Sequence, residues 1–446
     1  MNKPFQLTLI TLAIAASIGS AQAQTQTQSQ TQSQNYAVGF GPNPQLPAQE
    51  KSLIPTVNVA TAIGWPKDAK PVAAAGMSVA AYATGLDHPR WLYMLPNGDI
   101  LVAETNTPPK EDKEKHQIKA AVMGMAMKKA GAGVQSPNRI TLLRGIGANG
   151  IAATKTVFME GLNSPFGMTL VGNELFIANA DAIVKVPYKT GDTKITATPV
   201  KVADLPAGIN HHWTKNVIAS KDGKFLYATV GSNSNVGENG MDKEEGRAAI
   251  WQFDRVTGKG KIFASGLRNP NGLAFNPQSG MLWTAVNERD ELGNDLVPDY
   301  ITSVKEGAFY GWPYSYYGQN VDARIQPQKP ELVAKAIAPD FAMGAHTASL
   351  GLSFYEGALF PQLRNGALVG QHGSWNRKPA SGYKLVFVPF ADGKPSGPPQ
   401  DILTGFLNAD GKAMGRPVGV ISDKAGAILL ADDVGNVIWR VTPAAK

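Results

Sequence analysis

The sequence contains no cysteine, which excludes disulfides, thiolate metal sites and covalently attached haem. Long apolar runs are also scarce. The longest, residues 7–18, is shorter than the about 20 residues that a membrane-spanning helix needs. Charged residues make up only 17% of the chain, and the formal net charge of +7 is scattered, which does not indicate a nucleic-acid surface. Because the chain has no cysteine for covalent haem attachment, any redox chemistry would use a non-covalently held cofactor or none.

The N-terminus has the features of a secretory signal peptide. Lys3 precedes the apolar run, and Ala21-Gln22-Ala23 forms a small-residue cleavage site, so we expect residues 1–23 to be removed. A buried first helix is the alternative. The sequence thus predicts a periplasmic or secreted protein. A Gln/Thr/Ser tract that runs into Pro and Gly follows, and it predicts a disordered or extended tether over residues 24–70.

Residues 71–446 contain a repeated hairpin pattern. Tight turns between short apolar strands occur in six copies, with turn glycines at Gly98, Gly172, Gly223, Gly280, Gly366 and Gly426. A loop precedes each copy, as in "GLDHPRWLYM", "GLNSPFGMTL" and "GLRNPNGLAF". Each copy reads as a loop and four strands, which predicts an all-β fold, a six-bladed β-propeller. A β-sandwich is the structural alternative, but it would not need the repeated loop.

In a propeller, the loops that precede the innermost strands meet beside the central axis. The polar residues at their tips should therefore converge, namely His88, Arg90, Asn163, His211, His212, Arg268, Asn269, His346 and Arg416. Two insertions interrupt the pattern. Residues 108–133 resemble a basic helix that either covers an edge of the propeller or binds a membrane surface, and residues 306–318 form an aromatic loop that either walls a cofactor or packs on the surface.

Three groups of residues carry candidate chemistry. The pair His211–His212 suits a general base near neutral pH, with a structural role as the alternative. Arg268, Arg377, Lys378 and Arg416 come from three repeats and together suit a ligand with several carboxylates, unless they face solvent. The acidic stretch 286–300 carries oxygen donors of the kind that bind Ca²⁺, unless it is a solvated turn.

Four motifs together resemble a known family. "GLRNPNGLAF", "NERDELGNDLVPDY", "GAFYGWPYSYYG" and "GQHGSWNRKPASGYK" are similar to the soluble sugar dehydrogenases that depend on pyrroloquinoline quinone (PQQ), especially the L-sorbosone dehydrogenase branch, over residues 71–443. The resemblance implies PQQ and Ca²⁺ at the propeller axis and oxidation of a sugar or sugar aldehyde. It also implies transfer of electrons to an external cytochrome or quinone.

The same resemblance implies roles for single residues. His212 corresponds to the catalytic base, and Arg268 with Asn269 lies against the quinone; His211 stands where glucose-oxidising relatives have aspartate. The implied cofactor-binding set is Asn163, His211, Arg268, Asn269, Arg377, Lys378 and Arg416. The implied calcium ligands are the backbone carbonyls of Glu288 and Arg289, where relatives have Gly-Pro, and the pair Asn294–Asp295.

Two other functions fit the same architecture. A calcium-dependent lactonase would use Glu104, Asn179, Asn287 and Asp432, which end inner strands in four repeats and could hold one axial ion. A lactonase would not need the basic residues. A propeller that only binds protein or glycan would need no base, so its function would not depend on His212.

Overall fold

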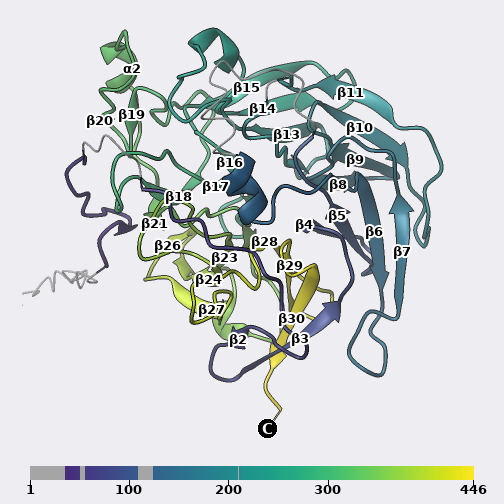
Figure 1. Ribbon diagram of the computed structural model, residues 1–446. Coiled ribbons are helices and arrows are strands. Elements are labelled where there is room, and N and C mark those ends of the chain that lie inside the picture. The colour runs from purple at the N-terminus through teal and green to yellow at the C-terminus, as the bar shows by residue number, and fades with distance from the viewer. Residues whose placement is uncertain (1–35, 51–55, 109–123, 209, 446) are drawn as a thin grey trace, which may run out of the picture. The chain divides into compact units, whose positions relative to one another are not determined.

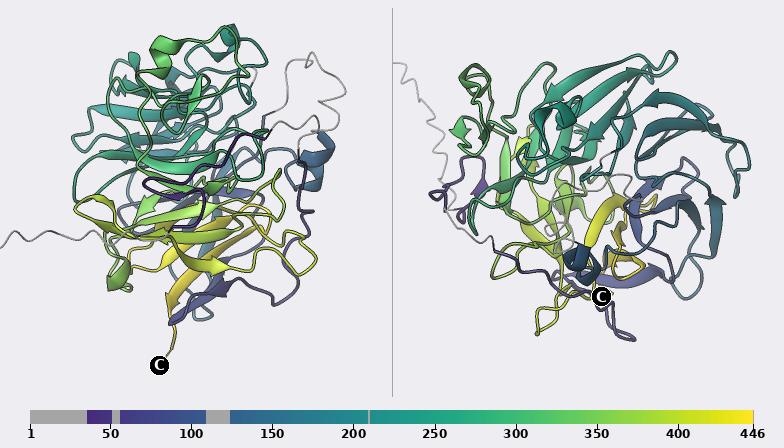
Figure 2. Two further views of the ribbon diagram at one scale, coloured as in Figure 1. Left: turned by 90° about the vertical axis from the view of Figure 1, so that its left-hand side faces the viewer. Right: turned by 45° about the horizontal axis from the view of Figure 1, so that its top comes forward.

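Six antiparallel sheets surround a common axis in the computed structural model, which describes residues 36–50, 56–108, 124–208 and 210–445 (Figures 1 and 2). Blade 1 comprises β4 (Pro89–Met94), β5 (Ile100–Glu104), β6 (Arg139–Arg144) and β7 (Thr154–Met159). Blade 2 comprises β8 (Met168–Val171), β9 (Glu174–Ala178), β10 (Ala182–Pro187) and β11 (Val200–Asp204). Blade 3 comprises β12 (Val217–Ala219), β13 (Phe225–Val230), β14 (Ala249–Asp254) and β15 (Gly260–Ser265).

The remaining three blades include strands from the N-terminal part of the chain. Blade 4 comprises β16 (Pro270–Phe275), β17 (Leu282–Val286), β18 (Pro298–Ser303), β21 (Phe341–Ala345) and β1 (Phe40–Gly41). Blade 5 comprises β22 (Ser353–Phe354), β23 (Ala367–Gln371), β24 (Lys384–Val388), β27 (Gln400–Thr404) and β2 (Val72–Ala73). Blade 6 comprises β28 (Pro417–Ser422), β29 (Ile428–Asp432), β30 (Val437–Pro443) and β3 (Met77–Ala83).

The blades form a closed ring. The innermost strands contact one another in the order β4, β8, β12, β16, β22, β28 and back to β4. The last blade takes its outer strand from the start of the domain, because β3 pairs antiparallel with β30 and places Val79 opposite Val441. The predicted six-bladed β-propeller is confirmed, and the pairing of β3 with the last strand, β30, closes the ring.

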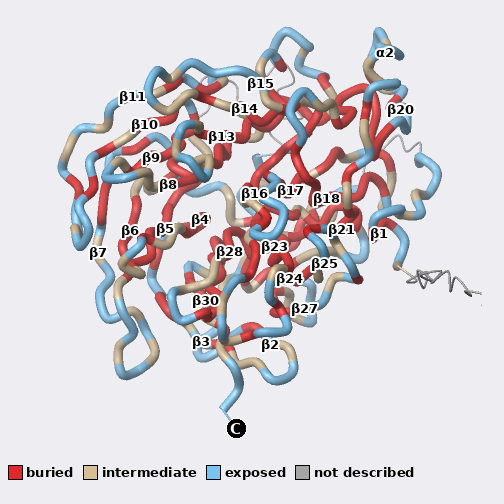
Figure 3. Tube along the Cα trace, turned by 180° about the vertical axis from the view of Figure 1, so that it is seen from behind, coloured by how far each residue is buried: buried red, intermediate tan, exposed pale blue. Residues whose placement is uncertain are grey.

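The second strand of each blade is buried on both faces. Segments such as Ile100–Glu104 and Ile428–Asp432 are buried at every position, which explains why they read as continuous apolar runs (Figure 3). Adjacent blades approach closely at Gly370 in β23, where a Cβ atom would overlap the carbonyl oxygen of Val418 in β28. Burial of both sheet faces between blades therefore supplies the core and fixes the radial geometry.

Helices are short in the described part of the chain. They are η1 (Met241–Glu244), α2 (Pro330–Val333), η2 (Pro361–Leu363) and a helical stretch at 124–129. That stretch belongs to the insertion predicted at 108–133, of which residues 109–123 lie outside the described residues. Two small hairpins lie outside the blades, β19 (Ser315–Tyr316) with β20 (Asn320–Val321) and β25 (Phe390–Ala391) with β26 (Lys394–Pro395).

The described residues 36–50 and 56–70, which belong to the predicted disordered or extended tether, contact the propeller. β1 pairs with β21, and the amide of Asn58 donates to the carbonyl of Trp375 at 2.7 Å. The indole of Trp65 donates to Asp432 at 2.7 Å. Tyr36 and Trp65 are partly buried against the hydrophobic core, which a purely polar tether would not allow. Residues 1–23, the predicted signal peptide, lie outside the described residues.

Among the described residues, no helix has the length and apolar character required to cross a membrane.

Candidate active site

The loops before the innermost strands converge at one end of the propeller axis. Each inner strand begins there, and the strand after it ends there, as the pairing of Pro89 with Glu104 and of Pro417 with Asp432 shows. Loop contacts between blades confirm the convergence: a Cβ atom on Gly231 would lie 2.6 Å from Cβ of His212 and 2.5 Å from Oδ1 of Asn269. Glycine at 231 therefore allows the loops of blades 3 and 4 to meet.

His212 is held in one tautomer by its neighbours. Its Nδ1 lies 2.8 Å from the carbonyl oxygen of Ser232 and 3.0 Å from the hydroxyl of the same residue. A carbonyl can only accept, so Nδ1 carries the hydrogen and Nε2 keeps its lone pair. The ring of His211 packs edge-on against it, with centroids 4.9 Å apart. This geometry gives His212 an imidazole nitrogen that can accept a proton.

The environment keeps His212 neutral. Burial lowers its pKa well below the ordinary value, and the positive charge of Arg268 and the neighbouring His211 lower the pKa further. The hydrogen bond to Ser232 and the charge of Asp290 raise the pKa by less. The imidazole is thus available as a base at neutral pH.

Arg268 and Asn269 lie beside this histidine. The guanidinium of Arg268 donates to the carbonyl of Glu288 at 2.6 Å and to Oδ1 of Asn235 at 3.0 Å, which fixes its orientation. Asn269 is buried, and its Oδ1 has no hydrogen-bond partner among the described residues. A buried oxygen without a partner is costly unless a ligand or water satisfies it.

A second polar cluster lies at the same end of the axis and was not predicted as a site. Asp433, directly after β29, accepts hydrogen bonds from Arg90 at 2.8 Å and from His372 at 2.9 Å, with His88 at 3.8 Å. Although burial would raise the pKa of Asp433, His372, Arg90 and His88 hold it well below its ordinary value. This cluster joins blades 1, 5 and 6 around one ionised carboxylate.

Arg416 borders that cluster and is fully buried. Its guanidinium lies 4.8 Å from the ring centroid of Tyr383 and 5.9 Å from that of Trp375. It donates to the carbonyls of His372 and Ala60 at 3.3 Å each, and its Nε has no partner among the described residues. It forms no ion pair with a described carboxylate. A buried cation in this state suits an anionic ligand.

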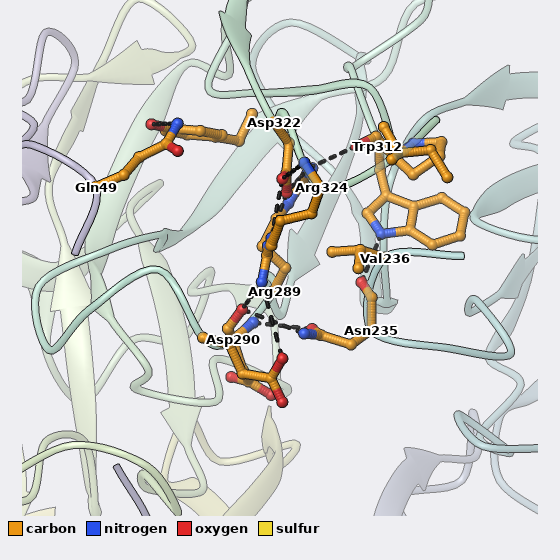
Figure 4. A network of polar contacts seen from close by, with 12 residues as sticks. Gln49, Asn235, Val236, Arg289, Asp290, Trp312, Asp322 and Arg324 are labelled. Carbon is orange, nitrogen blue, oxygen red and sulfur yellow. Dashed lines mark hydrogen bonds and ion pairs between the residues drawn. The ribbon is translucent and has the colours of Figure 1, made fainter. Parts of the chain in front are cut away.

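The residues predicted to bind calcium have hydrogen-bond partners within the chain, and their assignment stays a prediction. The carbonyl of Glu288 accepts the hydrogen bond from Arg268, and the side chain of Glu288 pairs with Arg289 at 3.0 Å. The guanidinium of Arg289 is itself buried between Glu288 and Asp322, 3.2 Å from the latter (Figure 4). Among the described residues, no cluster of three His, Cys, Asp or Glu suits a metal ion.

The other predicted ligands form a contact between two loops. Asp295 accepts from Arg377 at 2.7 Å, and Asn294 exchanges hydrogen bonds with the backbone of Lys378 at 2.8 and 3.1 Å. These four residues therefore connect the two loops through their mutual contacts. Asn163 is exposed.

Substitution of Asp295 by asparagine is expected to change the protein very little. The pair with Arg377 is solvent-exposed, with half of the Asp295 side chain accessible, so its loss should lower the free energy of unfolding by less than about 1 kcal/mol. Chemical denaturation of both proteins measures the difference. A loss of calcium-dependent activity or stability in Asp295→Asn would instead restore this residue as a calcium ligand.

The carboxylates of the lactonase alternative are also engaged. Glu104 accepts from Arg139 at 2.7 Å and from the backbone amide of Asp87 at 2.5 Å. Asp432 accepts from the amide of Arg416 at 2.8 Å and from the indole of Trp65. Both carboxylates therefore anchor loops at the axis.

Comparisons with known proteins agree with this geometry. Residues 171–374 match the family described as Glucose / Sorbosone dehydrogenase, and residues 318–444 match the family described as TrAA12-like. An uncharacterized protein of Borreliella burgdorferi is 30% identical over 288 residues, which cover 63% of this chain and 76% of that protein. Over residues 171–374, the chain is similar to the glucose/sorbosone dehydrogenase family.

Other relatives match a shorter stretch or the fold alone. The aldose sugar dehydrogenase YliI of Escherichia coli is 34% identical over 135 residues, which cover 30% of this chain and 32% of that protein. The holo form of the PQQ domain of pyranose dehydrogenase from Coprinopsis cinerea superposes with a TM-score of 0.67. That alignment covers 86% of this chain and all of the solved chain at 21% identity, so it shows the shared propeller fold.

Proposed function

We propose that this protein is a PQQ-dependent dehydrogenase that oxidises a sugar or sugar aldehyde, of the sorbosone or aldose type. The observation that carries the proposal is the central site, where a neutral imidazole lies beside Arg268 and Asn269, and where Arg416, a buried arginine without a described carboxylate partner, lies at the same end of the axis. The family match and the relative that acts on aldose sugars support the substrate class.

The residues at the axis fit an anionic cofactor. PQQ carries carboxylates, and Arg416 and Arg90 are buried cations whose Nε atoms lack partners among the described residues. Asn269 offers an unsatisfied amide oxygen beside Arg268. When bound, PQQ supplies a quinone that accepts hydride from the substrate carbon. Arg268 and Asn269 would hold its reacting end, and Arg416 with Arg90 its carboxylates.

His212 would take the proton of the substrate hydroxyl on Nε2. Nδ1 keeps its hydrogen on the carbonyl of Ser232, so the ring stays oriented as the proton arrives. The two electrons of the oxidised substrate leave the site for an external cytochrome or quinone. We also propose export by residues 1–23, which would place the reaction in the periplasm or outside the cell.

We assign no calcium ligand from the geometry, because the carbonyl of Glu288 and the side chains of Asn294 and Asp295 already have partners. Calcium dependence is therefore a variable of the test. The lactonase alternative gains no support from the engaged carboxylates Glu104 and Asp432.

The direct test is reconstitution. Purified protein is mixed with PQQ in Ca²⁺ or in EDTA, binding is followed by the cofactor's absorbance, and reduction of an artificial dye is measured across aldoses, sorbosone and simple aldehydes. We expect stoichiometric binding and sugar-dependent dye reduction. Absence of PQQ binding in both conditions would refute the dehydrogenase proposal, and binding without turnover on any substrate would favour a propeller that only binds ligands.

The pH profile of the reaction should reflect the lowered pKa of His212. A general base must be unprotonated, and a base whose pKa lies well below 6.5 stays so as the pH falls from about 7.5 through 6.5. We expect kcat/KM to be constant over that interval and to decrease only at more acidic pH. An apparent pKa at or above 6.5 in this profile, with circular dichroism unchanged, would contradict the assignment of His212.

A further inference from the structure

Asp290 is the open carboxylate of the central site. Its side chain is 42% exposed, whereas Glu288, Asp299 and Asp433 are each only 1% exposed. The other charged groups around it are hydrogen-bond donors that suit an anion. A sugar presents hydroxyl groups, each of which needs an acceptor as well as a donor. Of these four carboxylates, Asp290 alone is exposed enough to accept a hydrogen bond from a bound ligand.

The main chain of Asp290 is rigidly placed (Figure 4). Its amide donates to Oδ1 of Asn235 at 2.9 Å, and its carbonyl accepts from Arg324 at 2.8 Å and from Nδ2 of Asn235 at 3.2 Å. The indole of Trp312, from the aromatic loop predicted at 306–318, donates to the carbonyl of Asn235 at 2.9 Å. These bonds fix the direction in which the carboxylate leaves the backbone.

Two cations flank the carboxylate itself. Oδ1 lies 3.3 Å from Nδ1 of His346, whose Nε2 donates to the carbonyl of Gly293 at 2.9 Å, and Oδ2 lies 3.7 Å from Arg268. Dense protein surroundings would raise the pKa of Asp290, but His346 and Arg268 hold it well below its ordinary value. Ser232, whose carbonyl orients His212, donates its own amide to the carbonyl of Arg268 at 2.8 Å, so Arg268 links Asp290 to His212.

We propose that Asp290 binds a second hydroxyl group of the sugar and thereby determines which substrates are oxidised. This role rests on the proposed function. Asp290 would supply the hydrogen-bond acceptor that a sugar hydroxyl needs in a site otherwise lined by donors. With His212 taking the proton of the reacting hydroxyl, Asp290 lies on the other side of Arg268 and accepts a hydrogen bond from a neighbouring hydroxyl. His346 and Arg268 orient the carboxylate, and ionised acceptors form the stronger hydrogen bonds.

The test compares Asp290→Asn with the wild type on an aldose that is oxidised and on its monodeoxy analogues. Loss of a hydrogen bond to a charged group lowers kcat/KM by about 10- to 100-fold, and we expect the change mainly in KM. With one monodeoxy analogue, the wild type and Asp290→Asn should have the same kcat/KM, because that analogue lacks the hydroxyl that Asp290 binds. PQQ affinity should be unchanged. Asp295→Asn, in the same loop and facing Arg377, is the matched control and should behave as the wild type.

A second measurement separates this inference from the proposed function. Sugar binding to the cofactor-free protein is followed by saturation-transfer NMR, and Asp290→Asn should bind more weakly than the wild type and Asp295→Asn. Equal binding, or a loss of activity that is the same for every monodeoxy analogue, would overturn the role of Asp290. If the wild type oxidises no sugar, the proposed function fails while the binding measurement still decides whether Asp290 recognises hydroxyls. Asp290→Ser provides a second variant should the asparagine variant fold poorly.

Discussion

Replacement of His212 by glutamine is expected to lower kcat by about 10²- to 10⁴-fold, the range typical for loss of a general base. Glutamine has a similar volume and can keep a hydrogen bond to the carbonyl of Ser232, but it cannot accept a proton at neutral pH. KM and PQQ affinity should change little, because Nε2 acts on the reacting proton. Steady-state dye reduction and cofactor absorbance measure the three quantities separately.

His211→Gln is the matched control for this substitution. His211 is exposed and packs edge-on against His212, so its removal should affect activity by less than about 10-fold through the pKa of its neighbour. Equal losses in the two variants would assign the base to the pair and not to His212. Full activity of His212→Gln would exclude it as the base and would favour a propeller that only binds ligands.

The propeller could be predicted because each blade places the same structural requirements on its segment of the sequence. Each blade needs a strand buried on both faces, a tight hairpin and a loop that reaches the axis, and these leave a periodic pattern of apolar runs and turn glycines. The same periodicity placed His212, Arg268 and Arg416 at one end of the axis, and the structure brings the loops of the first two together through Gly231. Residues in equivalent loops are thus predictable from sequence.

The missed residues lie outside the loops that repeat. His372 and Asp433 follow the second strands of blades 5 and 6, and their pairing depends on which blades become neighbours when the ring closes. The surroundings of residues 288–295 were missed for a related reason: partners distant in the chain, Asp322 and Arg377, pair with Arg289 and Asp295. Long-range partners leave no local pattern.

The N-terminal segment was predicted from its overall composition, which does not reveal the few apolar residues that bind it to the propeller. The tract before residue 36 is rich in glutamine, but Trp65 and Phe40 are apolar enough to bind the propeller once its surface exists. Ala60 even contributes a carbonyl to Arg416, so this segment borders the candidate cofactor site.

Arg416→Met is expected to weaken PQQ binding by about 30-fold or more, since removal of one partner of a buried charged pair costs about 2–5 kcal/mol. Methionine keeps the contacts with Tyr383 and Trp375 but removes the charge. The cofactor-free protein should not lose stability in proportion, because its buried guanidinium already lacks a carboxylate and leaves Nε without a partner among the described residues. Titration with PQQ and thermal unfolding with and without PQQ measure both effects.

Arg440→Met gives the opposite pattern and serves as the control. Arg440 lies on β30 and pairs with Asp423 at 2.9 Å, so its loss should lower the stability of the cofactor-free protein while PQQ affinity stays unchanged. If Arg416→Met loses PQQ affinity but not stability, and Arg440→Met loses stability but not PQQ affinity, then Arg416 binds the ligand and Arg440 stabilises the fold. The two roles can be separated because PQQ stabilises only the protein that binds it. Wild-type PQQ affinity in Arg416→Met would show that this arginine does not hold the cofactor and that its burial serves only packing between blades 5 and 6.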